Sequence, residues 1–139
     1  MPSSAPLSTL ESRIASRKAR IGIIGMGYVG LPLTLLFSEQ RFQVTGFDVD
    51  TSKITALNSG GSYIVRIPAT EIVRAQASGF RATSSYKEIG EMDAVIICVP
   101  TPLDEYHQPD LSYIEQTAKA IAPHLREGQC ALRRRSEIP

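Results

Sequence analysis

The stretch RIGIIGMGYVG, residues 20–30, decides the fold of this 139-residue chain. After its arginine comes an uninterrupted apolar run, which predicts a β-strand buried on both faces of a sheet. A glycine at position 25 ends this run, and the following apolar residues recur at helical spacing over residues 28–40. Pro32 fits such a helix because it falls near the first turn, where a missing N–H is little loss. A strand that turns through glycines into a helix predicts the start of a β-α-β unit.

The same alternation continues along the rest of the chain. It predicts strands over residues 42–47, 80–83 and 93–99, and helices over residues 52–58, 69–78 and 111–122. We expect an α/β fold: a Rossmann-like doubly wound parallel sheet with strand order 3-2-1-4, incomplete at its C-terminal side. Residues 129–132 are a candidate for a fifth strand.

Three segments follow from this pattern. Residues 1–19 form an N-terminal extension with a short amphipathic helix, residues 20–129 form the Rossmann domain, and residues 130–139 form an atypical C-terminal tail. The tail contains three consecutive arginines, and we expect them to be exposed to solvent and not to form a phosphate-binding site.

The composition is that of an ordinary folded domain. Hydrophobic residues make up 42% of the chain and charged residues 21%, which excludes a disordered protein. The net charge of +1 attracts neither a nucleic acid nor a membrane surface. The most apolar stretch, residues 21–37, is broken by glycines and a proline and is shorter than the ~20 residues that a bilayer requires. Two cysteines are too few for a disulfide framework, which favours the reducing cytoplasm. Together with the net charge and the broken apolar stretch, this predicts a cytoplasmic protein without nucleic-acid or membrane partners.

The glycines of the turn follow the pattern G-x-G-x-x-G, at Gly25, Gly27 and Gly30. The first permits a tight turn after the strand, the second lets a diphosphate approach the backbone, and the third lets the helix pack closely on the sheet. The exposed N–H groups near Tyr28 and Val29, with the positive end of the helix dipole, would then hold the diphosphate of a dinucleotide.

An acidic residue stands where such a site needs one. Asp48 ends the second strand, 18 residues after the last glycine of the turn, and would accept hydrogen bonds from the adenosine ribose. A 2′-phosphate would meet like charge there, so we expect NAD in preference to NADP. Lys53 complicates this preference, since it could neutralise extra negative charge. The alternative is that Asp48 only stabilises a turn or helix end, although Asp50 and Thr51 already offer a helix cap.

A second part of the site is expected after the strand over residues 93–99, in the sequence Val99-Pro100-Thr101-Pro102. The carboxyl end of this strand lines the crevice where the strand order reverses, and ligands bind in that crevice. The alternative is a rigid strand exit with a solvent-facing threonine. Together the predicted cofactor-binding residues are Gly25, Met26, Gly27, Tyr28, Val29, Gly30, Asp48, Lys53, Val99, Pro100 and Thr101.

The residues show no convincing catalytic or metal site. Cys98 lies inside an apolar strand, where a thiol behaves as a small buried hydrophobe, and Cys130 offers no better nucleophile. His107 and His124 are too far apart from each other and from the cysteines for metal-ligand spacing.

Several separated motifs resemble one family in the same order. They are IGIIGMGYVGLPL, VTGFDVD with Lys53, SYI, DAVIICVPTPL, PDLSYIE and IAPHLREGQ, which together cover about residues 10–129. This pattern resembles the UDP-glucose/GDP-mannose dehydrogenases, and most closely their UDP-N-acetylhexosamine 6-dehydrogenase branch. The resemblance implies NAD as cofactor, contacts at residues 25–30, Asp48, Lys53 and Thr101, and oxidation of the C6 alcohol of a UDP-sugar to a carboxylate for polysaccharide synthesis.

The chain departs from this family after Gln129. Members typically continue with a segment of the type VLESTTYPG, and their sugar-nucleotide domain, nucleophilic cysteine and partner lysine follow later. We therefore expect a truncated or frame-shifted product that lacks turnover on its own. The alternatives are a NAD-binding or interaction module without catalysis, or a fragment of another Rossmann dehydrogenase, which would not account for CVPTP and PDLSYIE.

An incomplete sheet has a further consequence. Its last strand presents an unpaired edge, and some apolar helix surface stays uncovered. We expect the chain to self-associate, as a homo-oligomer or less specifically.

Overall fold

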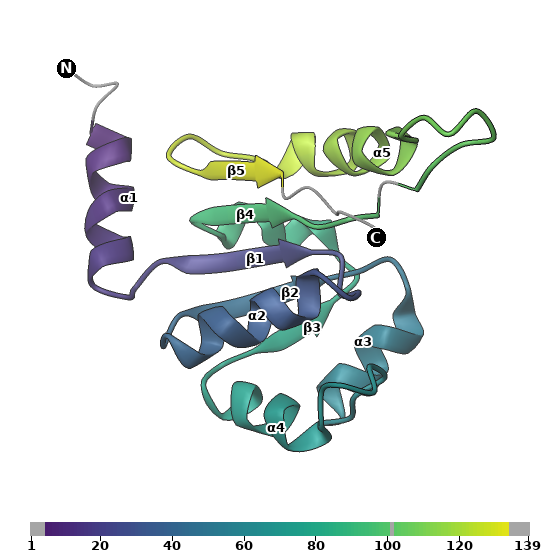
Figure 1. Ribbon diagram of the computed structural model, residues 1–139. Coiled ribbons are helices and arrows are strands. Elements are labelled where there is room, and N and C mark those ends of the chain that lie inside the picture. Colours follow the sequence, from purple (N-terminus) through teal and green to yellow (C-terminus); the bar gives the residue numbers. More distant parts are fainter. Residues whose placement is uncertain (1–4, 101, 134–139) are drawn as a thin grey trace.

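A computed structural model describes residues 5–100 and 102–133 as a five-stranded parallel sheet in the order β3-β2-β1-β4-β5 (Figure 1). The strands are β1 (Arg20–Ile24), β2 (Gln43–Phe47), β3 (Arg81–Thr83), β4 (Ala94–Ile97) and β5 (Cys130–Arg133). The predicted strand order is confirmed. The candidate fifth strand is also present, because β5 pairs in parallel with β4 and extends the sheet to Arg133.

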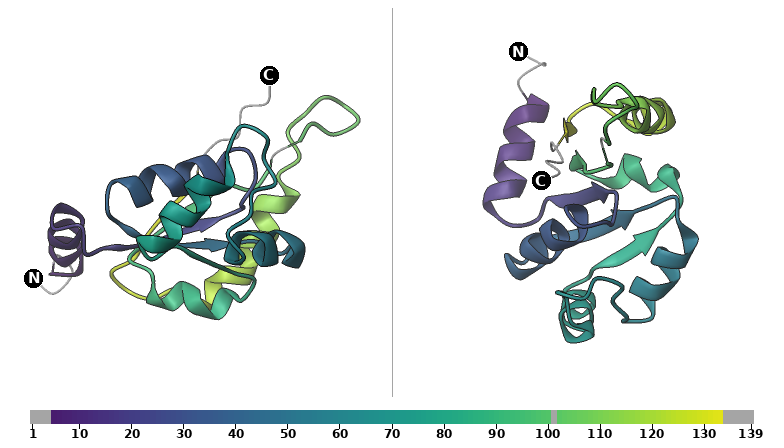
Figure 2. Two further views of the ribbon diagram at one scale, coloured as in Figure 1. Left: turned by 90° about the horizontal axis from the view of Figure 1, so that it is seen from below. Right: turned by 45° about the vertical axis from the view of Figure 1, so that its right-hand side comes forward.

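Helices cover both faces of the sheet (Figures 1 and 2). The α-helices are α1 (Ala5–Ala15), α2 (Gly30–Glu39), α3 (Thr51–Asn58), α4 (Ala69–Ala77) and α5 (Ser112–Ile121), and the 3-10 helices are η2 (Tyr86–Glu91) and η3 (Ala122–His124). Helices α2, α3 and α4 contribute to one hydrophobic cluster, and η2 and α5 contribute to the other. The predicted helices are confirmed, whereas η2 follows no helical periodicity and was not expected.

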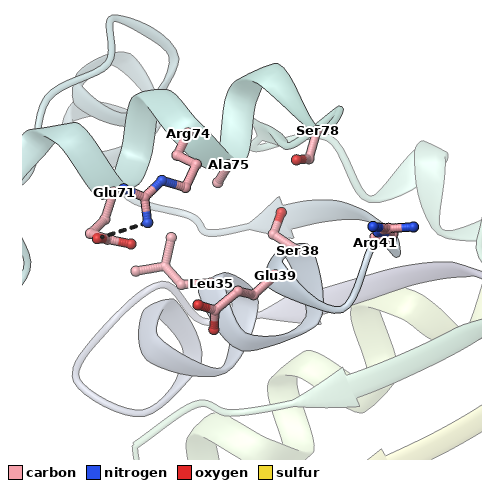
Figure 3. A pocket seen from close by; sticks show the side chains of 8 residues that line it. All are labelled: Leu35, Ser38, Glu39, Arg41, Glu71, Arg74, Ala75 and Ser78. Atoms are coloured by element: carbon pink, nitrogen blue, oxygen red, sulfur yellow. Dashed lines mark hydrogen bonds and ion pairs between the residues drawn. The ribbon is translucent and has the colours of Figure 1, made fainter.

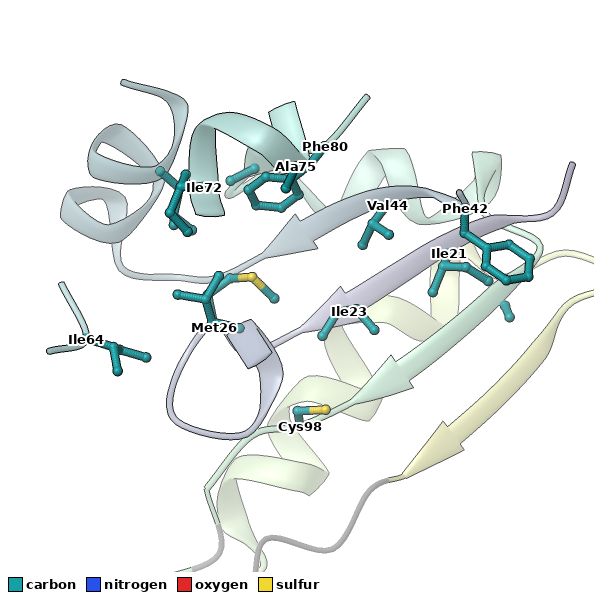
Figure 4. Packing of buried hydrophobic residues seen from close by; sticks show 14 of the residues in the cluster. Ile21, Ile23, Met26, Phe42, Val44, Ile64, Ile72, Ala75, Phe80 and Cys98 are labelled. Carbon is teal, nitrogen blue, oxygen red and sulfur yellow. The ribbon is translucent and has the colours of Figure 1, made fainter. Parts of the chain in front are cut away.

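Strand β1 lies at the centre of this architecture. Ile21 and Ile23 point into the cluster beneath α2 and α4, and Ile24 points into the cluster beneath η2 and α5. All three side chains are buried, which explains why the strand shows a continuous apolar run instead of polar alternation. Figure 4 shows the first cluster, with the fully buried Met26 near Phe80 just beyond the end of β1.

The N-terminal helix α1 stands beyond the amino end of β1 (Figures 1 and 2). The Asp93 carboxylate connects this region to the sheet. It accepts hydrogen bonds from the Arg20 amide at 2.7 Å, from the Arg13 guanidinium at 3.1 Å and from the Arg126 guanidinium at 3.4 Å. Burial favours the neutral acid, but these donors outweigh it and lower the pKa of Asp93 below its ordinary value.

Candidate dinucleotide-binding site

The predicted site residues gather at the carboxyl ends of three neighbouring strands. Ile24 of β1 pairs with Phe47 of β2 on one side and with Ile97 of β4 on the other. The segments that follow these strands, which begin at Gly25, Asp48 and Cys98, therefore leave the sheet side by side. The chain order reverses between β1 and β4, and this is the position where open parallel sheets bind ligands.

The three glycines of the turn have different surroundings. Gly25 has a φ of +99°, and a Cβ there would lie 2.8 Å from the Cys98 carbonyl oxygen. At Gly30 a Cβ would lie 1.6 Å from the Gly25 carbonyl oxygen, so α2 begins in direct contact with the turn. Gly27 differs from both, because a Cβ there would meet no atom within 4 Å. The turn thus leaves open space at Gly27, the position where a diphosphate would approach.

The backbone of this turn offers unused hydrogen-bond donors. Within the described part of the chain, the N–H groups of residues 27–30 have no acceptor. Tyr28 is 74% exposed, and Val29 precedes the first residue of α2. Helix α2 begins at Gly30, two residues later than the apolar periodicity predicts, because Tyr28 and Val29 remain in the turn. Unpaired N–H groups at the positive end of a helix are suited to an anionic ligand.

Asp48 lies directly beside the turn. Its carboxylate accepts hydrogen bonds from the Met26 amide and the Asp50 amide, both at 2.9 Å. Asp48 therefore does stabilise a turn, which was the alternative to a ribose-binding role, but it does not cap α3. Asp50 has that role, since its side chain accepts from the Ser52 amide at 3.0 Å. The half-buried Asp48 carboxylate keeps lone pairs for a further donor, because each of its oxygens can accept two hydrogen bonds.

Met26 turns all of its groups toward the protein. Its side chain is fully buried, its amide donates to Asp48, and its carbonyl accepts a hydrogen bond from the Tyr63 hydroxyl. These contacts of Met26 hold the turn in place.

Tyr63 was not among the predicted site residues. It lies in the loop between α3 and α4, where no periodicity indicates which way a side chain points. Its ring also lies under the Lys53 ammonium, with the nitrogen 5.7 Å from the ring centroid. Burial raises the pKa of Tyr63, and the negative charges of Asp48 and Asp50 raise it further, so the hydroxyl stays protonated as a donor.

The exit of β4 forms the other side of the site. Val99 is half-buried against the cluster under η2 and α5, and Pro100 is exposed. Thr101 lies outside the described residues. Cys98 is buried, as predicted, and its amide donates to the Ile24 carbonyl at 2.7 Å. Neither cysteine forms a disulfide, and the described residues include no group of three His, Cys, Asp or Glu side chains that could hold a metal ion.

A separate pocket of about 230 Å³ lies between α2 and α4 (Figure 3). Its lining shares no residue with the predicted site and includes Glu39, Arg41, Glu71 and Arg74, so opposite charges balance. Arg74 already pairs with Glu71 at 3.4 Å.

No helix in the ranges that the structure describes has both the length and the apolar character needed to cross a bilayer.

Relatives of known identity share this fold and sequence. A UDP-N-acetyl-D-mannosamine dehydrogenase from Escherichia coli K12 is 36% identical over 110 residues, which cover 79% of this chain and 26% of that protein. An NDP-N-acetyl-D-galactosaminuronic acid dehydrogenase from Ralstonia nicotianae is 41% identical over 78% of this chain and 25% of its own length. The GDP-mannose dehydrogenase structure from Pseudomonas aeruginosa superimposes with a TM-score of 0.77 at 31% identity, covering 83% of this chain and 28% of that one.

The chain thus spans about a quarter of the length of the curated relatives that it matches. Residues 19–139 also match the sequence pattern of the UDP-glucose/GDP-mannose dehydrogenase family, NAD binding domain. The predicted resemblance is confirmed: this chain belongs to the UDP-glucose/GDP-mannose dehydrogenase family and corresponds to its NAD-binding domain.

Proposed function

We propose that the turn over residues 25–30 holds the diphosphate of NAD. The observation that supports this most directly is the combination of open space at Gly27 with unpaired N–H groups at residues 27–30. A diphosphate needs several donors and close access to the backbone, and both are present at the start of α2. Gly25 and Gly30 support the site indirectly, because their lack of a side chain allows the turn to form.

Asp48 is proposed to accept hydrogen bonds from the adenosine ribose. Its carboxylate is held by two backbone amides, so it meets the ligand in a fixed orientation. A negative charge held in this way disfavours a 2′-phosphate, which favours NAD over NADP. Lys53, Val99, Pro100 and Thr101 complete the proposed set of contacts.

For the whole protein, we propose oxidation of the C6 alcohol of a UDP-sugar to a carboxylate, as a step in polysaccharide synthesis in the cytoplasm. The names of the relatives support an N-acetylated hexosamine as the sugar. NAD, when bound, accepts the hydride from the alcohol carbon. The part of this reaction proposed for these 139 residues is cofactor binding. Buried Cys98 is unsuited to nucleophilic catalysis.

Calorimetric titration of the chain with NAD, NADH and NADP tests the proposal. We expect saturable binding of NAD and NADH and much weaker binding of NADP. Absence of NAD and NADH binding by folded protein would contradict the proposed function. A parallel assay of NADH formation from NAD and UDP-N-acetylglucosamine tests the proposal that these 139 residues contribute cofactor binding only. Turnover by this chain alone would show that it contains a complete catalytic site.

A further inference from the structure

We infer that Tyr63 is a positioning residue of the NAD site, which orients the glycine turn through Met26 and holds the Lys53 ammonium over its ring. This inference rests on the proposed function. It assigns a role in that site to a loop residue that follows α3 and contributes no group to the turn itself.

The hydroxyl of Tyr63 acts on a specific peptide plane. It donates to the Met26 carbonyl, and this carbonyl shares its plane with the N–H of Gly27. Because the two groups point in opposite directions across a trans peptide, fixing the carbonyl also fixes the N–H. The Gly27 N–H is one of the unpaired donors proposed to face the diphosphate.

Without this hydrogen bond the plane could turn over. Glycine at position 27 permits backbone conformations that other residues avoid, so a rotated peptide meets little steric resistance there. The rotated form would present the Met26 carbonyl oxygen, and not an N–H, to an anionic ligand. The preceding plane is already held, since the Met26 amide donates to Asp48 at 2.9 Å. Asp48 and Tyr63 thus hold the two planes on either side of Met26.

The ring of Tyr63 has a second effect. The Lys53 nitrogen lies 5.7 Å from the ring centroid, and Lys53 makes no ion pair with a carboxylate in the described residues. A cation at this distance from an aromatic face is attracted to it. The ring therefore limits the positions of the ammonium and keeps a positive charge near a site proposed for the dianionic diphosphate of NAD.

The experiment separates the hydroxyl from the ring. Tyr63→Phe removes only the hydrogen bond, Tyr63→Leu removes the ring as well, and Lys53→Met removes the charge. Tyr113→Phe is the matched control, because Tyr113 lies on α5, far from the turn in sequence, and is 47% exposed. Each variant is titrated with NAD by calorimetry, and the amide resonance of Gly27 is followed by NMR in the cofactor-free protein.

We expect Tyr63→Phe to shift the Gly27 amide resonance and to weaken NAD binding about three- to tenfold, which corresponds to the loss of one hydrogen bond. Tyr113→Phe should change neither. With Lys53 present, Tyr63→Leu should weaken NAD binding more than Tyr63→Phe does. In the Lys53→Met background, the two substitutions at Tyr63 should weaken NAD binding equally.

Two results are kept apart by this design. If the unaltered chain fails to bind NAD, the proposed function is wrong, and the assignment of Tyr63 to an NAD site fails with it. If the unaltered chain binds NAD but Tyr63→Phe leaves both the affinity and the Gly27 resonance unchanged, the positioning role alone is overturned.

Discussion

The Met26 amide donates a hydrogen bond of 2.9 Å to the Asp48 carboxylate, and this contact joins the turn after β1 to the end of β2. The carboxylate thereby has two roles, one toward the protein and one proposed toward the ribose of NAD. Removing its charge should therefore affect both the turn and the proposed binding of NAD.

Asp48→Asn is expected to weaken NAD binding by about 1–3 kcal/mol, because a hydrogen-bonded charged acceptor is replaced by a neutral amide. The preference for NAD over NADP should fall as well, since the like-charge repulsion of a 2′-phosphate is removed. Calorimetric titration with both cofactors measures the two effects. Asp50→Ala is the control: it removes the cap of α3 and should lower stability by about 1 kcal/mol while keeping the cofactor preference. If both substitutions changed NAD affinity and cofactor preference equally, the assignment of Asp48 to the ribose would be contradicted.

Alanine substitutions at Gly27 and at Gly30 should have different effects, the first on NAD affinity and the second on the stability of the domain. At Gly27 the added methyl group has open space, so the protein should fold with unchanged or slightly raised stability, but NAD affinity should fall at least about tenfold as the methyl occupies the approach of the diphosphate. At Gly30 the methyl group would lie 1.6 Å from the Gly25 carbonyl oxygen, so the domain itself should be destabilised.

Thermal unfolding monitored by circular dichroism, combined with NAD titration, distinguishes these two outcomes. Normal NAD binding by Gly27→Ala would show that the open space at this glycine is not used by the cofactor.

The sheet could be predicted from the sequence because its signals are local. The apolar run before Gly25 and the second apolar run before Asp48 indicate buried strands, and right-handed connections then determine their order. The cap of α3 by Asp50 could be predicted for the same reason, since capping depends on the next few residues.

The remaining features depend on contacts between distant residues. Tyr63 reaches Met26 across 37 positions, and Asp93 reaches the Arg20 amide across 73. Periodicity shows which face of an element is apolar, but it does not show which loop folds back onto a turn. The part of Met26 in the site could not be predicted either, because its place in the glycine motif indicates proximity to a ligand and not the direction of its groups.

Asp93 is expected to make stability depend on pH. Its folded-state pKa is lowered below 3.8 because its hydrogen bonds to Arg20, Arg13 and Arg126 outweigh the effect of burial. The stabilisation is therefore fully present above the unfolded-state value and is lost as the pH falls through the folded-state value. Asp93→Asn should cost about 1–3 kcal/mol at pH 7 and much less in acid, where the natural carboxyl is protonated too.

Urea unfolding of both proteins at pH 7 and at a pH below the folded-state pKa of Asp93 measures this difference. Glu91→Gln, at an exposed position close to Asp93 in the sequence, is the control and should have little effect at either pH. A cost of Asp93→Asn that stays the same at both pH values would show that the ionised carboxylate does not stabilise the fold.

The free edge of β5 should promote self-association. This strand ends the sheet and pairs only with β4 among the described strands, and Leu132 on it is 55% exposed. Unpaired strand edges with apolar side chains attract further strands, whereas a lysine on the edge discourages them. We expect the molar mass from light scattering to rise with protein concentration, and Leu132→Lys to suppress that rise. Val73→Lys alters a similarly exposed residue on α4, at 54%, and should leave the association unchanged. A constant monomer mass, or an equal effect of both lysine substitutions, would exclude the β5 edge as the contact.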